Sequence, residues 1–118
     1  MTEKQKDYYL EMLKHNRMFT YKIKNRLACL ITFYIGNEND KNRFVRNNMW
    51  SIVNDNKEGR ICWIDHLITD KNSDNLKLSY KVWDVFKEYI ILRFPSVKLI
   101  SWNRWKNEKV TNYKEELR

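Results

Sequence analysis

The sequence predicts an α+β fold: a mixed sheet made of an antiparallel meander followed by a βαβ unit, with helices on both faces. Two observations support this prediction. Apolar runs of strand length, bounded by turn-forming residues, fill much of the first half of the chain. A long amphipathic segment then follows, ended by the only proline and by one further apolar run. At 118 residues the chain is expected to form one domain, 1–118.

The first helix is predicted over residues 3–18. Thr2 followed by Gln5 is typical of a capping box, in which the two side chains satisfy each other's backbone N–H groups. The apolar residues that follow at roughly helical intervals are Tyr9, Met12, Leu13 and Met18. From Phe19 the pattern changes to alternation, which indicates extended chain.

Three strands are predicted next. The run 27–35 is apolar on both of its faces, as expected for a central strand that is covered on both sides. A polar loop at 36–43 leads to a second strand at 48–53, and a second turn leads to a third at 60–69. These three strands are expected to form the antiparallel meander.

A long helix is predicted to begin near Ser73 or Asp74, either of which is a good N-cap, and to end at Pro95. One helical stripe contains Leu76, Tyr80, Trp83, Phe86, Ile90 and Phe94. A strand at 97–102 follows, and the crossover through the helix makes it parallel to the strand before the helix. The tail, 106–118, is predicted to be a short helix.

The net charge is +8, from 23 Lys and Arg against 15 Asp and Glu. This excess favours polyanionic partners, so nucleic acid or an acidic host protein is a possible partner. Basic residues gather at 14–26, 40–46 and 104–109, which either converge into one patch or lie on separate solvated surfaces.

The longest apolar stretch, 27–35, is too short to span a bilayer, and the charged N-terminal residues lack the apolar segment of a signal peptide. A cytoplasmic location is therefore expected. Cys29 and Cys62 both fall inside predicted strands and outside any Cys/His cluster, so we expect reduced core thiols and no metal site.

By element order, residues 3–115 resemble the GNAT superfamily of N-acetyltransferases. The resemblance implies that the strand before the long helix contacts the acyl group and that a glycine-containing loop holds the pyrophosphate of acetyl-coenzyme A. Here the corresponding stretch reads "DKNSDNLK" and has no glycine. The resemblance therefore assigns phosphate contacts to Lys71, Ser73 and Lys77.

A narrower resemblance is carried by "GRICWIDHLITD" and "FKEYIILRFPSVKLISWNR", which are similar to segments of the toxin-activating lysine acyltransferases and of small GNAT-like proteins from bacteriophages. Those acyltransferases take the acyl chain from acyl carrier protein and lack the glycine-rich loop. In that family an aspartate on this strand pairs with a histidine near the N-terminus. The resemblance places the aspartate at Asp65, and His15 is the only upstream candidate for the histidine.

The neighbouring residues Asp65 and His66 are both candidates for a general base. Strict alternation puts Asp65 on the face of Trp63 and His66 on the face of Cys62 and Ile64. Asp65 then either accepts a proton from an amine or forms a structural ion pair. His66 is either a core histidine, a general base or a surface residue.

Tyr113 is where the GNAT resemblance places the tyrosine that protonates the departing thiolate, on the predicted tail helix, although a packing role is the alternative there. A different candidate surface combines aromatic with basic residues, which can stack on bases or bind an acidic partner. Its members are Trp102, Arg104, Trp105 and Lys106.

The sequence thus favours a divergent acyltransferase-fold protein that, if active, transfers an acyl group from acetyl-coenzyme A or acyl carrier protein to an amine. The alternatives are a non-catalytic basic binding module, for nucleic acid or a host protein, and a small virion or assembly component.

Overall fold

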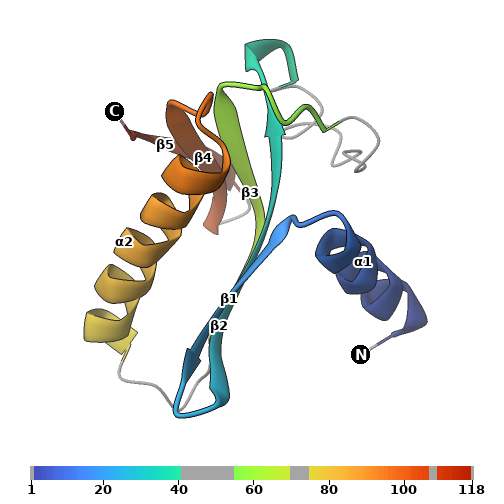
Figure 1. Cartoon of the computed structure of the whole chain (residues 1–118), viewed down its shortest axis with the longest axis vertical. Helices are drawn as coiled ribbons and strands as arrows, with labels where there is room; N and C mark the ends of the chain where they lie inside the picture. The colour runs from blue at the N-terminus through green and yellow to red at the C-terminus, as the bar shows by residue number, and fades with distance from the viewer. Residues whose placement is uncertain (1, 41–54, 70–74, 107–108, 118) are drawn as a thin grey trace.

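The computed structural model describes residues 2–40, 55–69, 75–106 and 109–117, and for 75–80, 105–106 and 109–110 it describes the backbone alone. This part of the chain forms two long helices and five strands, with three strands between the helices and two after the second helix (Figure 1). Their bounds are α1 Glu3–Lys14, β1 Met18–Ile23, β2 Arg26–Gly36, β3 Ile61–Thr69, α2 Asn75–Arg93, β4 Leu99–Lys106 and β5 Lys109–Glu116, with a short 3-10 helix at Glu38–Asp40.

The strands form one mixed sheet in the order β1-β2-β3-β4-β5. Neighbouring strands are antiparallel except β3 and β4, which are parallel and joined through α2. The predicted mixed sheet and βαβ unit are therefore confirmed. The meander differs from the prediction, because β2 pairs directly with β3, and its third strand is β1. The predicted strand at 48–53 lies outside the described residues.

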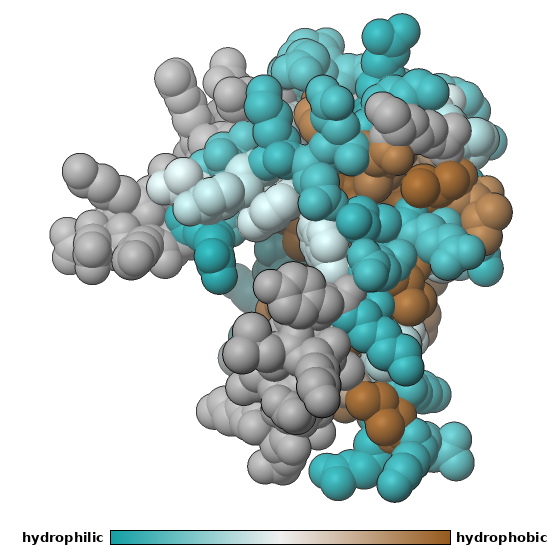
Figure 2. All heavy atoms as spheres, turned by 90° about the vertical axis from the view of Figure 1, so that its left-hand side faces the viewer, coloured by the Kyte–Doolittle hydropathy of each residue, from teal (hydrophilic) through white to brown (hydrophobic). Residues whose placement is uncertain are grey.

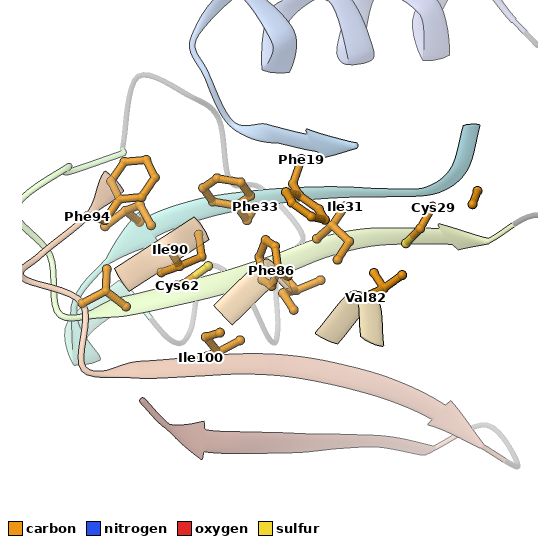
Figure 3. Close-up of a cluster of buried hydrophobic side chains, with 14 residues drawn as sticks. Phe19, Cys29, Ile31, Phe33, Cys62, Val82, Phe86, Ile90, Phe94 and Ile100 are labelled. Carbon is orange, nitrogen blue, oxygen red and sulfur yellow. The ribbon is translucent and has the colours of Figure 1, made fainter. Parts of the chain in front are cut away.

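The two helices cover opposite faces of the sheet, as predicted (Figure 1). On the α2 face, Phe86 and Ile90 of the helix pack against Phe33 and Cys62 of the sheet, all of them buried (Figure 3). On the α1 face, Met12 packs with Tyr34 and Trp63 in a smaller cluster. Burial of these apolar side chains holds both helices on the sheet.

The predicted capping box begins α1: Thr2 Oγ1 accepts from the Gln5 backbone N–H at 3.2 Å, and Gln5 Oε1 accepts from the Thr2 N–H at 2.9 Å. The helix ends at Lys14, four residues earlier than predicted, because Asn16 adopts a left-handed conformation with φ 59°. The chain then turns into β1.

The predicted tail helix is wrong, since residues 109–116 form β5, which pairs with β4 over its whole length. The apolar residues Val110, Tyr113 and Leu117 have a spacing that fits a helix. The open edge of β4 offers backbone hydrogen-bond partners that a solvated helix cannot use, so tertiary pairing overrides this local pattern.

Among the described residues, neither long helix has the length and apolar character needed to cross a membrane. The side of the molecule on which α2 lies shows many hydrophilic residues with several apolar ones among them (Figure 2).

Replacing Gly59 by alanine is expected to lower the free energy of unfolding by about 1–3 kcal/mol, the usual cost of overpacking. A Cβ at position 59 would lie 2.4 Å from the backbone oxygen of Gly36, and a backbone oxygen inside a paired strand cannot move away cheaply. Urea unfolding measures the change. The exposed neighbour Glu58→Ala should differ from the wild type by less than about 0.5 kcal/mol. Equal stabilities of the two variants would contradict this packing.

Candidate active site

A β-bulge in β3 brings the two candidate bases to the same face of the sheet. The pairing with β2 runs Phe33 to Ile64 and then Thr32 to His66, so Asp65 is an extra residue with no partner of its own in the register. Asp65 and His66 both contact tyrosines of α1. The predicted placement of His66 on the face of Cys62 and Ile64 is therefore wrong, because the bulge interrupts strict alternation.

Asp65 is held by a chain of hydroxyl groups. The Tyr8 hydroxyl donates to Asp65 Oδ2 at 2.5 Å, so its oxygen accepts from the Thr32 hydroxyl at 2.7 Å. The Thr32 oxygen in turn accepts from the backbone N–H of His66 at 3.1 Å. This chain fixes one oxygen of the carboxylate and ties α1, β2 and β3 together at the bulge.

His66 is positioned by Tyr9, whose hydroxyl lies 3.0 Å from His66 Nδ1. The opposite ring nitrogen, Nε2, lies 4.0 Å from Asp65 Oδ2. The side chain of His66 is 45% exposed, whereas that of Asp65 is 21% exposed. Because the His66 imidazole is half-exposed, a bound molecule can reach it and transfer a proton to it. The nearby carboxylate of Asp65 then stabilises the positive charge on the ring.

The sequence pattern places Tyr9 in the apolar stripe of the first helix and gives Tyr8 no role, and it predicts neither tyrosine as part of a site. Tyr8 and Tyr9 are consecutive on α1, and their rings lie 5.1 Å apart in an edge-on arrangement. The Tyr8 ring is also 4.9 Å from the imidazole of His66. Two adjacent tyrosines in a helix do not by themselves indicate a site. They would do so only if it were already known that the helix crosses the sheet beside Asp65 and His66.

Burial and the negative charge of Asp65 raise the pKa of Tyr8, Tyr9 and Tyr34 above the ordinary value. The phenols around Asp65 therefore remain neutral hydrogen-bond donors throughout the physiological pH range.

We expect the free energy of unfolding to fall as the pH rises above about 10. The folded pKa values of Tyr8 and Tyr34 lie above their ordinary value of 10.0, so the unfolded chain loses these protons first. Their contribution is thus complete below that pH and is lost as the pH rises towards the folded pKa. Urea unfolding at about pH 8 and about pH 11 measures how far the free energy of unfolding falls between the two pH values.

In Tyr8→Phe the free energy of unfolding should fall less between these two pH values, because the variant lacks one of the phenols whose pKa is raised. A wild-type stability that is the same at both pH values would contradict the expectation.

The β3–β4 ladder opens beside Asp65. Its described register comprises four pairs and ends at Ile64 and Trp102, although both strands continue. Beyond this point β3 stays paired with β2, and β4 stays paired with β5. The two parallel strands thus stop sharing hydrogen bonds immediately before the bulge residue.

The structure does not bring Tyr113 to Asp65 and His66. Tyr113 lies on β5 and stacks on Trp102, with ring centroids 5.9 Å apart. Trp102 also makes a T-shaped contact with Trp83 of α2, with ring centroids 5.1 Å apart, so this group belongs to the α2 face. The prediction that Tyr113 lies on a helix is wrong, since the residue is in β5, and its ring packs on the face of the sheet opposite Asp65 and His66.

The alternative binding surface is only partly described. Trp102 stacks on Tyr113 and makes a T-shaped contact with Trp83, so its ring forms part of the packing on the α2 face. Arg104 is exposed on β4, and the side chains of Trp105 and Lys106 lie outside the described residues.

The predicted phosphate contacts are untested. Lys71 and Ser73 lie outside the described residues, and Lys77 is described only by its backbone in α2.

His15 does not pair with Asp65. It caps the C-terminal end of α1 and bonds to Glu11 at 3.0 Å. The histidine beside Asp65 is His66, its neighbour in sequence. Cys29 and Cys62 are buried thiols, as predicted, and burial raises the pKa of both.

Comparison with known proteins gives a likeness in fold alone. No protein-family profile matches the sequence, and no curated protein matches it. The loading GNATL domain of CurA from Lyngbya majuscula superposes with a TM-score of 0.62 at 11% identity, over 83% of this chain and 49% of that one. The GphF GNAT-like decarboxylase, in complex with isobutyryl-CoA, superposes with a TM-score of 0.68 at 10% identity, over 87% of this chain and 53% of that one.

A further solved structure, described as an acetyltransferase, gives a TM-score of 0.50 at 13% identity, over 88% of this chain and 64% of that one. The chain thus spans about half the length of the first two structures. Identities this low establish architecture, and architecture does not fix a reaction. The protein has a GNAT-like fold: a mixed five-stranded sheet between two helices, with its parallel ladder opening at Asp65.

Proposed function

We propose that the protein is a divergent acyltransferase that transfers an acyl group from a thioester to an amine. The observation that carries this proposal is the Asp65–His66 pair, which lies on the bulge where the parallel ladder opens in a GNAT-like fold. Tyrosine hydroxyls hold both side chains in place, and His66 is exposed enough to meet a bound molecule.

In the proposed reaction the amine nitrogen attacks the thioester carbonyl carbon. A C–N bond forms, the C–S bond breaks and the sulfur leaves as a thiolate. An acceptor bound as an ammonium ion first releases one proton to solvent, which frees the nitrogen lone pair for attack. The second proton, lost as the amide forms, passes to His66, and the carboxylate of Asp65, 4.0 Å from Nε2, stabilises the imidazolium. Tyr9 fixes the ring through Nδ1, while Tyr8 fixes the carboxylate.

The proposed donor is acetyl-coenzyme A or acyl carrier protein. The GphF domain with a similar fold is in complex with isobutyryl-CoA, which supports an acyl-CoA donor here. Lys71, Ser73 and Lys77 are the proposed phosphate contacts, because α2 begins at Asn75 and the N–H groups of a helix start attract phosphate. The narrower sequence resemblance supports acyl carrier protein as the donor instead.

A transfer assay tests the proposal. The protein is mixed with a panel of primary amines and with acetyl-CoA, isobutyryl-CoA or octanoyl-acyl carrier protein, and mass spectrometry detects acylated amine. We expect product that requires the protein, the amine and one of these donors. No product from any donor across the panel would overturn the proposal. Binding of oligonucleotides that weakens steeply with salt would then favour a basic binding module.

A further inference from the structure

A pocket of about 610 Å³ lies beside the candidate active site, between α1, the beginning of β2 and the end of β3. Its lining is mainly aliphatic and includes Leu10, Leu27 and Ile68. These three side chains are 63%, 48% and 49% exposed, so the fold leaves their apolar surface uncovered. A volume of this size falls within the range of small-molecule sites.

Tyr9 belongs both to the wall of this pocket and to the active-site cluster. Its ring lines the pocket, and its hydroxyl lies 3.0 Å from His66 Nδ1. The proposed base is therefore one hydrogen bond away from a residue of the pocket lining.

Two charged groups lie near the pocket, Lys6 in its lining and Asp65 beyond Tyr9, and Lys6 and Tyr9 are three residues apart on α1. Lys6 is the only charged side chain in the described lining. The negative charge of Asp65 adds to burial in raising the pKa of Tyr9, so the field of the carboxylate reaches the pocket wall there. A positive group is favoured beside Tyr9, whereas the Lys6 ammonium nearby is paired with Glu3 at 3.8 Å.

The described lining of the pocket comes from α1, β2 and β3, whereas the strands that stop pairing beside Asp65 are β3 and β4. A donor in the open ladder and a second molecule in the pocket would therefore approach the bulge from different directions. This separation favours the acceptor, rather than the acyl chain, as the occupant of the pocket.

We infer that the pocket binds the apolar body of a small primary amine acceptor, with its amino group beside Tyr9 and His66. This inference rests on the proposed function and specifies its substrate class. A lysine side chain of a protein would fill only a small part of the space, so an aryl-alkyl or longer alkyl amine fits better.

Direct binding without any donor tests the inference. Isothermal titration calorimetry compares 3-phenylpropylamine with 3-phenylpropanol, which lacks the charge, and with ethanolamine, which lacks the apolar body. We expect the amine to bind at least about tenfold more tightly than either, a difference of about 1.4 kcal/mol. Equal affinity for the alcohol would overturn the head-group assignment, and equal affinity for ethanolamine would overturn the apolar site.

The variant Leu10→Ser/Leu27→Ser should weaken binding of 3-phenylpropylamine by about tenfold or more, because it removes apolar contact from two exposed positions. Leu92→Ser is the matched control, since Leu92 is 76% exposed on α2 and lies outside the pocket lining. An unchanged dissociation constant in the double variant, or an equal loss in the control, would place the binding elsewhere.

The two proposals fail separately. Selective binding of 3-phenylpropylamine without acyl transfer from any donor would overturn the proposed function and support the pocket assignment. Transfer to ethanolamine at the same rate as to 3-phenylpropylamine, together with no selective binding, would overturn the pocket assignment and leave the proposed function standing.

Discussion

Replacing His66 by glutamine is expected to lower kcat/KM for acyl transfer by about 10²–10⁴-fold, the usual contribution of a general base. Glutamine keeps a hydrogen-bonding group near Tyr9 but cannot take up the amine proton. Because the His66 side chain is 45% exposed, the change should leave the free energy of unfolding nearly intact. Steady-state kinetics with the donor and amine that support transfer measure the effect, and urea unfolding confirms the fold.

His15→Gln is the matched control, because the sequence has two histidines and His15 lies at the far end of α1, bonded to Glu11. It should retain wild-type kcat/KM. Asp65→Asn preserves the size of the side chain and removes its charge, so its loss should fall between those of the two histidine variants. Full activity in His66→Gln would exclude His66 as the base, and a loss in Asp65→Asn alone would transfer that role to Asp65.

Replacing Asp55 by alanine is expected to lower the free energy of unfolding by about 3–5 kcal/mol, as for other buried ion pairs that lose one partner. Asp55 accepts from Arg17 through Nε at 2.9 Å and Nη2 at 2.5 Å, and from the Ile35 backbone N–H at 2.6 Å. The two side chains are only 5% and 11% exposed. Without Asp55, the guanidinium loses its carboxylate in a site that water reaches poorly, and the Ile35 N–H loses its acceptor.

Urea unfolding followed by circular dichroism measures this change. Glu11→Ala breaks the exposed pair with His15, in which the side chains are 51% and 43% exposed, and should cost less than about 1 kcal/mol. The double variant Arg17→Met/Asp55→Leu should recover part of the loss, because neither charge is then left unpaired. Asp55→Ala as stable as Glu11→Ala would show that the buried pair contributes little.

Most elements could be predicted from local patterns. The capping box at Thr2 and Gln5 began a helix as expected, because its two hydrogen bonds join residues three positions apart. The run at 27–35 became β2, covered on both faces, since a strand buried on both sides needs apolar residues throughout. The parallel β3–β4 pair followed from the intervening helix, which a parallel connection requires.

The site was only half predictable. Asp65 and His66 could be recognised in the sequence as polar residues within a strand-like run. That both lie on the same face could not be predicted, because the bulge depends on how β3 pairs with β2. Tyr8 and Tyr9 belong to the site because α1 crosses the sheet there, and nothing local to the helix indicates that crossing.

The sequence by itself thus determined the types of α1, β2, β3, α2 and β4, the mixed sheet and the presence of a polar pair on β3, since these depend on side-chain periodicity and short-range capping. Only the tertiary structure decided that residues 109–116 are a strand, that Arg17 and Asp55 pair across 38 positions, and that Tyr8 and Tyr9 hold Asp65 and His66. Each of these depends on contacts between distant segments, which form only when burial of the core brings those segments together.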